Sequence, residues 1–418
     1  MAELIEIGEE QEKVILVAVS LSDGDDTEES LDELEELADT AGAVTVGRVI
    51  QKRENIQAGT YIGKGKIEET GELIESLGAT GIICDDELSP IQMKNLEDAL
   101  NTKVMDRTML ILDIFAKHAF TAEGKLQVEL AQLKYRSARL IGMHSFMSRV
   151  SYGIGMRGPG EKKLEMDRRL IKDRVAQLSA ELREMEKNRS TARAKRLKSG
   201  TPVVAITGYT NAGKSTLLNR LTGAGILEAD MLFATLDPTT RAMKLDNGQE
   251  ILFTDTVGFI RKLPHHLVDA FHSTLEEAKY ADIVLHVVDV SNPQAYKQMH
   301  VVYETLKRLG IADKPVITAF NKSDLKTDSE PVKDLNCDES IEISAKKGDG
   351  VDRLVELIVE KLREQKKLFE QVIAYSNAGV IQQIRKSGQL LEEEYLPEGV
   401  RIKAYLPNDL YMKLTAVK

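Results

Sequence analysis

The residues best suited to chemistry form a glycine-rich octet in the middle of the chain. It fits G-x-x-x-x-G-K-[ST] and consists of Gly208, Tyr209, Thr210, Asn211, Ala212, Gly213, Lys214 and Ser215. In this motif backbone N–H groups wrap a phosphate, the lysine reaches the β- and γ-phosphates, and the serine hydroxyl binds Mg²⁺. A glycine-rich turn before a helix also arises by chance, so further motifs must support the assignment.

Three further motifs follow predicted strands. Asp255-Thr256-Val257-Gly258 supplies a carboxylate that can hold Mg²⁺ through water and a backbone N–H for the γ-phosphate. In Asn321-Lys322-Ser323-Asp324 the aspartate can accept from guanine N1–H and N2–H₂ together, whereas adenine has no matching donor pair. Ser344-Ala345-Lys346 can offer backbone donors to guanine O6. Four motifs in this order predict a Mg²⁺-dependent GTPase, which hydrolyses GTP to GDP and phosphate.

A switch segment is expected between the octet and Asp255. Such a segment needs a threonine whose hydroxyl meets Mg²⁺ only while the γ-phosphate is present. We assign this role to Thr235, with Thr239 and Thr240 as alternatives, and a plain Thr/Pro turn as the simplest interpretation. Nucleotide contacts are expected from Phe233, Ala234, Thr235, Leu236 and Asp237. The predicted catalytic residues are Lys214, Thr235 and Gly258, and the predicted metal ligands are Ser215, Thr235 and Asp255.

Two residues bear on how hydrolysis is catalysed. Phe259 follows Gly258 at the position where many small GTPases carry a glutamine that orients the attacking water, which phenylalanine cannot do. We therefore expect slow unaided hydrolysis, with the missing group supplied by a partner or by rearranged switch loops. Asn211 could help to hold a K⁺ ion that offsets charge developing on the phosphates. The alternative is that Asn211 only forms a hydrogen bond within the loop or to a switch.

The elements that position these motifs alternate between strand and helix. Over residues 200–365, strands are expected at 202–207, 251–254, 283–289, 316–320 and 340–343, with helices near 214–223, 262–280, 294–309 and 351–365. This alternation predicts a doubly wound α/β domain. Residues 1–120 alternate in the same way and predict a small parallel α/β domain, with strands at 14–19, 44–50, 80–84 and 103–105. Residues 366–418 predict a small α+β module, which combines the segment 369–375, a helix at 378–387 and a strand at 400–405.

Between the two α/β domains, residues 121–199 predict an antiparallel helical hairpin. Apolar residues recur on one face of each half, and the expected loop, 142–160, holds five glycines together with Arg149 and Arg157. A basic run at 187–198 predicts a helix tail that grades into a linker. Arginines on a flexible glycine loop suit contacts with folded RNA backbone. A solvated helical spacer is the alternative.

Length and composition narrow the class of protein. The 418 residues predict two to four domains, and the net charge of −11 excludes a simple basic nucleic-acid coat protein. Residues 1–40 carry −14, so the remainder carries +3 and can present a basic surface. Cys84 and Cys337 have no spacing typical of zinc sites or disulfides, and no early apolar run is long enough to span a membrane. We expect a cytoplasmic protein without a membrane span, and a monomer.

Together these motifs resemble the HflX family of translation-associated GTPases over nearly the whole chain. The resemblance extends beyond the generic motifs to residues 59–66, 153–161, 164–169 and 233–240 and to Phe259. It implies a GTPase that binds the large ribosomal subunit through ribosomal RNA, is stimulated by ribosomes, and acts in ribosome splitting, rescue or biogenesis. An accessory GTPase for RNA remodelling or modification, which does not act on assembled ribosomes, is the alternative. Residues 63–66 also raise the question of an ATP site, although a turn with solvated lysines is simpler.

Overall fold

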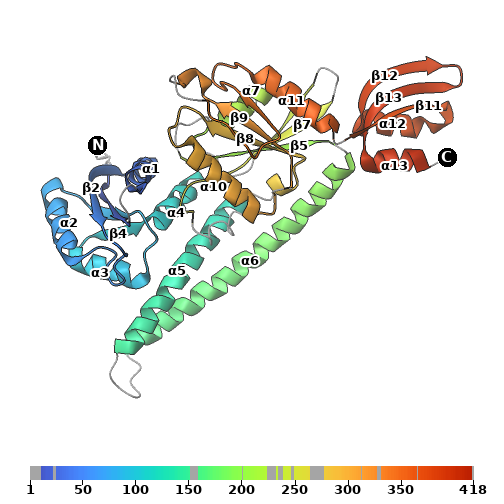
Figure 1. Ribbon diagram of the computed structural model, residues 1–418. Coiled ribbons are helices and arrows are strands. Elements are labelled where there is room, and N and C mark those ends of the chain that lie inside the picture. Colours follow the sequence, from blue (N-terminus) through green and yellow to red (C-terminus); the bar gives the residue numbers. More distant parts are fainter. Residues whose placement is uncertain are drawn as a thin grey trace, which may run out of the picture. The chain divides into compact units, whose positions relative to one another are not determined.

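The computed structural model describes residues 11–21, 25–150, 159–199, 201–223, 232–233, 239–245, 249–263, 277–311, 313–326, 331–364 and 366–416. These residues form two compact units (Figure 1). The first unit contains most of residues 11–182 together with 232–233 and 261–263. The second contains the other described residues from 183 onward.

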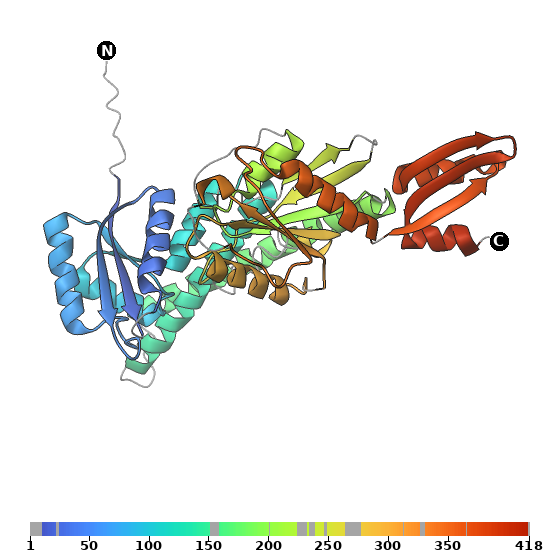
Figure 2. The same ribbon diagram turned by 45° about the horizontal axis from the view of Figure 1, so that its top comes forward.

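The first unit is built on a four-stranded parallel sheet in the order β2-β1-β3-β4. Its strands are β1 (Lys13–Ser20), β2 (Val44–Lys52), β3 (Gly81–Cys84) and β4 (Lys103–Asp106). Its helices are α1 (Thr27–Thr40), α2 (Lys64–Leu77), α3 (Pro90–Leu100) and α4 (Arg107–His118), and they cover both faces of the sheet (Figure 2). β1 and β3 are apolar and buried because helices exclude water from both sides. The predicted small parallel α/β domain is confirmed.

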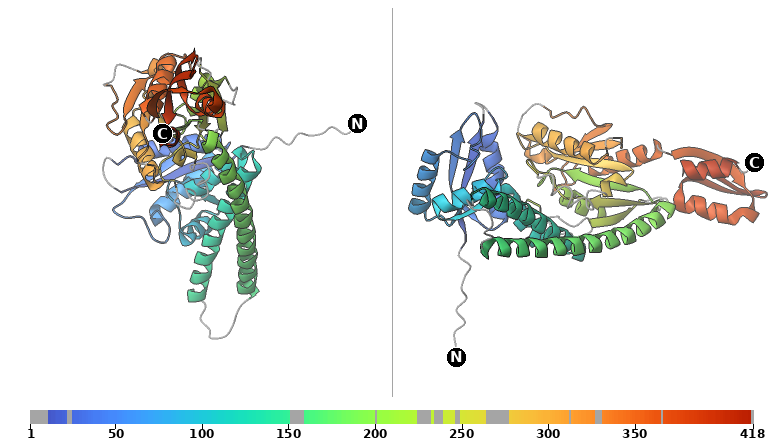
Figure 3. Two further views of the ribbon diagram at one scale, coloured as in Figure 1. Left: turned by 90° about the vertical axis from the view of Figure 1, so that its right-hand side faces the viewer. Right: turned by 90° about the horizontal axis from the view of Figure 1, so that it is seen from below.

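Two long helices follow this sheet. They are α5 (Ala122–Val150) and α6 (Pro159–Ser199), and they lie side by side in opposite directions (Figure 3). Arg174 of α6 donates to both carboxylate oxygens of Glu129 on α5, at 2.7 and 2.9 Å. The helices extend further than predicted: α5 includes residues 142–150, and the basic run 187–198, expected to grade from a helix tail into a linker, is helical throughout. For α6 the reason is that residues 161–199 contain no glycine or proline, and Lys and Arg favour helix.

The second unit contains a six-stranded sheet in the order β10-β9-β8-β5-β7-β6. Its strands are β5 (Val203–Gly208), β6 (Thr239–Lys244), β7 (Glu250–Asp255), β8 (Ile283–Asp289), β9 (Val316–Asn321) and β10 (Glu339–Glu342). Its main helices are α7 (Lys214–Thr222), α10 (Ala295–Arg308) and α11 (Val351–Glu364). Only β6 runs antiparallel among these strands. This confirms the predicted doubly wound domain.

The edge strand β6 was not predicted. It contains Thr239 and Thr240, which the sequence offered as alternative switch residues, and the Thr240 hydroxyl lies 2.9 Å from that of Thr254 on β7. β6 escaped prediction because it is exposed and mostly polar, so it lacks an apolar run. Of the helix expected near 262–280, the structure describes only residues 277–279 as helical; residues 264–276 lie outside the described residues.

The C-terminal module is a three-stranded antiparallel sheet in the order β11-β13-β12, packed against two helices. Its elements are β11 (Lys366–Ile373), α12 (Ala378–Ser387), β12 (Gln389–Leu396), β13 (Gly399–Pro407) and α13 (Asn408–Ala416). The predicted α+β character is confirmed, but β12 and α13 were not predicted. β12 carries three consecutive glutamates, and Arg401 and Lys403 of β13 lie 3.7 and 3.6 Å from Glu394 and Glu392. Such cross-strand pairing is not visible in a local sequence pattern.

Candidate nucleotide-binding site

Four loops meet at the carboxyl edge of the six-stranded sheet. They follow β5, β7, β9 and β10, and they carry the four predicted motifs. The chain order of the strands reverses between β5 and β8, and ligands of open α/β sheets bind outside the carboxyl ends of strands at such a point. The topology therefore places the motifs where a doubly wound fold binds its ligand.

The loop after β5 is shaped by two glycines that accept no side chain. A Cβ at Gly208 would lie 2.3 Å from the Val287 carbonyl oxygen, and one at Gly213 would lie 2.3 Å from Nδ2 of Asn321. Gly213, with φ of 89°, is the residue before α7, and no side chain caps this helix. The first N–H groups of α7 are thus available to a phosphate, where the helix dipole favours negative charge.

Lys214 is buried at the start of α7. Its Nζ donates to the Tyr209 carbonyl at 2.6 Å, and the side chain sits within the loop it follows. Burial lowers the pKa of Lys214 to about 8, and the nearby Asp255 carboxylate only partly opposes this shift. An anionic ligand would pair with this buried ammonium group and favour its charged form.

Ser215 and Asp255 meet at the position predicted for the metal ion. The Ser215 hydroxyl donates to Oδ2 of Asp255 at 2.8 Å, and Asp255 is fully buried. The next residue, Thr256, ties the start of this loop to β5, because its N–H and hydroxyl both donate to the Ile206 carbonyl, at 3.2 and 2.8 Å. A hydroxyl and a carboxylate are hard oxygen ligands that fit Mg²⁺. The third predicted ligand, Thr235, lies outside the described residues, as do Ala234, Leu236 and Asp237.

The segment after Asp255 lies directly on the phosphate loop. The Thr210 N–H donates to the Phe259 carbonyl at 2.8 Å, and the Phe259 N–H donates to the Gly208 carbonyl at 3.1 Å. A Cβ at Gly258 would lie 2.9 Å from Cα of Thr210 and 2.8 Å from its Cγ2, so only glycine fits there without a backbone shift. The Phe259 side chain is buried. Within the described part of the chain, the buried Thr210 hydroxyl has no hydrogen-bond partner, which leaves it available to a ligand oxygen.

Asn321 connects the loops after β9 and β10 to the phosphate loop after β5. Its Nδ2 donates to the Ala212 carbonyl, and its Oδ1 accepts from the Ala345 N–H, both at 2.9 Å. The next residue, Lys322, has φ of 61°, and its Nζ lies 2.7 Å from Oδ2 of Asp289. The amide of Asn321 therefore holds three of the four motifs together through backbone groups.

Asp324 is prepared to accept hydrogen bonds as a carboxylate. It lies in the short 3₁₀ helix η1 (Ser323–Leu325) and accepts from the Ser344 hydroxyl at 2.8 Å, while Lys347 lies 3.7 Å away. The hydrogen bond from Ser344 is the main cause that lowers the pKa of Asp324. An ionised carboxylate at this edge can accept two donors from guanine.

Two residues of this site were not found from the sequence. Arg220 of α7 donates to the carbonyls of Ala345 and Lys346, at 3.2 and 2.6 Å, and so supports the Ser344 loop. Asp289 pairs with Lys322 at the end of β8. Asp289 could have been found, because the carboxyl end of a predicted central strand is where ligand-binding loops start. Arg220 gave no local signal, since it acts across 125 residues of chain.

Phe233 and the segment 59–66 belong to the first unit. Phe233, with φ of 57°, is buried, and its ring lies edge-on to Phe115 of α4 with centroids 4.6 Å apart. Its contact with nucleotide remains a prediction. In the segment 59–66, Lys66 pairs with Glu69 at 2.8 Å, and an ATP site there remains a prediction.

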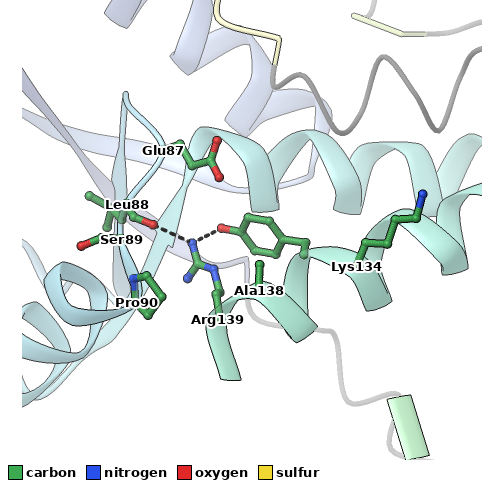
Figure 4. A pocket seen from close by; sticks show the side chains of 8 residues that line it. Glu87, Leu88, Ser89, Pro90, Lys134, Ala138 and Arg139 are labelled. Carbon is green, nitrogen blue, oxygen red and sulfur yellow. Dashed lines mark hydrogen bonds between the residues drawn. The ribbon is translucent and has the colours of Figure 1, made fainter. Parts of the chain in front are cut away.

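A hollow of about 450 Å³ in the first unit lies apart from these motifs (Figure 4). One of its two cations, Arg139, already donates to Asp106 at 2.6 Å and to the Leu88 carbonyl at 3.4 Å. Tyr135 also donates to Asp106. Arg139 and Tyr135 of α5 therefore serve internal contacts with Leu88 and with Asp106 at the end of β4.

The described residues include neither a helix that could span a membrane nor a metal-binding cluster. No helix in these ranges has the length and apolar content required to cross a bilayer. Within the same ranges, no three His, Cys, Asp or Glu side chains gather as a metal-binding group. Cys84 and Cys337 are free thiols.

The chain is similar to known proteins along most of its length. Three family models match in succession: GTP-binding GTPase N-terminal over residues 28–116, GTP-binding GTPase middle region over 118–196, and 50S ribosome-binding GTPase over 203–322. GTPase HflX of Lacrimispora saccharolytica is 62% identical over 414 residues, 99% of this chain and 98% of that protein. GTPase HflX of Escherichia coli K12 is 41% identical over 354 residues, 84% and 83% of the two chains. A solved GTP-binding protein from Sulfolobus solfataricus, in complex with GDP, matches at 26% identity with a TM-score of 0.43, covering 84% of this chain and 98% of that one.

The first prediction concerns base choice. Asp324→Asn replaces one carboxylate acceptor by a donor, so GTP affinity should fall about 100-fold or more, because the guanine donors lose their partner. Affinity for xanthosine triphosphate, whose C2 carbonyl can accept from the new amide, should rise. Nucleotide titrations measure both, with the exposed Asp352→Asn in α11 as the matched control. Unchanged GTP affinity would show that Asp324 does not recognise the base.

The second prediction concerns pH. Phosphates raise the pKa of Lys214 above its value of about 8 in the free protein, so binding favours the protonated lysine. GTP affinity should be constant well below pH 8 and should fall by up to about tenfold per pH unit above it. Calorimetric titration between pH 6.5 and 9.5 measures the affinity, and buffers of different ionisation enthalpy measure the accompanying proton uptake. Constant affinity and no proton uptake up to pH 9.5 would contradict it.

Proposed function

This chain belongs to the HflX family of GTPases, and from that premise we propose that it engages the large ribosomal subunit while loaded with GTP and leaves after hydrolysis. In this proposal it acts in the cytoplasm, as a monomer, in ribosome splitting, rescue or biogenesis. The single observation that carries it is the convergence of the four nucleotide motifs at one sheet edge, since a nucleotide switch needs a site that senses the γ-phosphate.

The proposal gives each predicted catalytic and metal-binding residue a role. Lys214 neutralises the β- and γ-phosphates, and the Gly258 N–H turns toward the γ-phosphate. Ser215 and Asp255, 2.8 Å apart, would hold Mg²⁺, which neutralises charge on the β- and γ-phosphate oxygens. Thr235 is proposed as the third ligand, and Asp324 as the residue that selects guanine. Phe259 is buried and apolar, so a partner or a rearranged switch supplies the group that orients water.

The helical hairpin supports an RNA-containing partner. Arg168 and Arg169 are exposed near the start of α6, beside Met166 and Leu170, which are 65% and 62% exposed. Guanidinium groups bind phosphates, and exposed apolar side chains of this size mark interaction surfaces. The accessory-GTPase alternative uses the same chemistry, so the choice between the two depends on the partner that is bound.

The third prediction separates these functions. With a non-hydrolysable GTP analogue, the protein should sediment with isolated large subunits, and those subunits should accelerate GTP hydrolysis by about 10³. The double variant Arg168→Glu, Arg169→Glu should weaken binding and reduce its salt dependence by roughly one unit of slope per lost phosphate contact. Arg183→Glu lies roughly 22 Å further along α6 and is the control. Failure to sediment, with hydrolysis unaffected by subunits, would favour the accessory alternative.

The fourth prediction concerns Asn211, which is exposed in the phosphate loop with φ of 59°. If its side-chain oxygen helps to hold K⁺, intrinsic hydrolysis should be faster in potassium than in sodium at equal ionic strength. Asn211→Ala should then remove the difference between the two salts. Equal rates of the parent protein in both salts would exclude a potassium role and leave the partner-supplied group.

A further inference from the structure

Arg220 is a cation of α7 that belongs to none of the four nucleotide motifs. The helix begins at Lys214, so Arg220 lies six residues, or about 9 Å, further along it. Its Nε donates to the Ala345 carbonyl at 3.2 Å, and its Nη2 donates to the Lys346 carbonyl at 2.6 Å. One side chain of the helix that follows the phosphate loop therefore holds two consecutive peptide groups of the loop after β10.

The loop after β10 folds into a turn around this guanidinium group. The Gly348 N–H donates to the Ser344 carbonyl at 2.7 Å, which closes the turn. Gly348 has φ of 95°, and a Cβ there would lie 3.4 Å from Cζ of Arg220. The Ser344 hydroxyl donates to Asp324 at 2.8 Å. The turn is thus fixed on one side by Arg220 and on the other by Asp324.

The N–H groups of this turn point in defined directions. The Ala345 N–H donates to Oδ1 of Asn321 at 2.9 Å, and the Lys347 N–H donates to a hydroxyl of the same turn at 3.2 Å. Between them, the Lys346 N–H has no acceptor among the residues that the structure describes. The peptide group between Ala345 and Lys346 is trans, so its N–H points away from its carbonyl and hence away from Arg220.

We propose that Arg220 is a positioning residue for guanine specificity, because its grip on the Ala345 carbonyl directs the Lys346 N–H toward O6 of a bound guanine. Arg220 acts through this peptide group and does not contact the nucleotide. Guanine carries an acceptor at O6, whereas adenine carries an amino donor at the same position, so a fixed N–H favours guanine and opposes adenine. This inference rests on the proposed GTPase function and adds a residue outside the motifs to its base recognition.

The place of Arg220 in α7 also relates the base to the phosphates. Lys214, in the first turn, is the residue that would bind phosphate, and Arg220 lies in the last turn. Leu217 and Leu218, between them, are fully buried in the core of the domain, which keeps the helix in place. A guanine nucleotide therefore meets its phosphate donors and the Lys346 N–H at a spacing that one packed helix sets.

The fifth prediction tests this role by changing one residue and one ligand atom. In 6-thio-GTP, sulfur replaces O6 and is a weaker acceptor, whereas ITP keeps O6 and lacks only the 2-amino group. Arg220→Gln should weaken the binding of GTP and of ITP about fivefold, the scale of one hydrogen bond, and that of 6-thio-GTP by no more than about twofold. The preference for O6 over sulfur should fall, while the preference for GTP over ITP should not change.

Calorimetric titrations measure these affinities, with Arg353→Gln as the matched control. Arg353 lies on α11 and pairs with Glu356 at 2.8 Å in an exposed pair, so its loss should leave all three affinities unchanged. General damage to the site would lower all three affinities equally in Arg220→Gln. Equal losses, or none, would overturn the proposal. Arg220 is exposed, so its replacement leaves no cavity in the core, and thermal unfolding verifies that the variant folds.

Hydrogen exchange tests the direction of the Lys346 N–H without any substitution. In the parent protein, GDP should slow exchange of the Lys346 amide more than 6-thio-GDP does, and equal protection would overturn the proposal. In Arg220→Gln, KM for GTP should rise while kcat stays nearly constant, because Arg220 does not reach the phosphates. A fall in kcat with unchanged KM would also overturn it. If the parent protein does not prefer GTP to ATP, the proposed function fails; if it does and Arg220→Gln keeps the full preference for O6, only the role of Arg220 fails.

Discussion

One buried amide sets the spacing on which the nucleotide site depends. Asn321 donates to the Ala212 carbonyl, 109 residues earlier in the chain, and accepts from the Ala345 N–H in the next loop. A buried amide must satisfy both of its ends, so these loops are held at fixed distances. The same amide occupies the space that a side chain at Gly213 would need. The second glycine of the octet is therefore required by the Asn321 motif as well as by a phosphate.

In our proposal, the residues that bind the phosphates differ from the group that orients the attacking water. Lys214 is buried against a carbonyl oxygen, and Ser215 is the group that directly contacts Asp255. An interior arranged in this way favours a ligand that brings negative charge. The position after Gly258 carries a buried apolar ring, and phenylalanine cannot orient a water molecule. In our proposal the timing of hydrolysis is therefore set by contacts outside the phosphate loop.

The sequence predicted features encoded by short, strong patterns. The fold class, the central strands and the position of all four motifs at strand ends follow from apolar runs and glycine placement. It did not predict β6 and β12, because these edge strands are polar and are stabilised by pairing with a neighbour. It also missed the end of α5 at residues 142–150, and it expected the basic run 187–198 of α6 to grade into a linker, since a run of basic residues resembles a linker. Arg220 and the pairing of Lys262 with Asp85 depend on distant partners, which no local pattern reveals.

The C-terminal sheet has two open edges, and their charges determine which other strands can pair with them. β12 forms one edge and presents Glu392, Glu393 and Glu394 in succession, while β11 forms the other with Lys366 and Lys367 at its start. An unpaired strand is a template for intermolecular sheet formation, and charged side chains oppose it. Each of these glutamates lies beside a cation of the same module, namely Lys403, Arg385 or Arg401. A strand added at β12 would have to match or displace three ion pairs, which disfavours self-association through this edge.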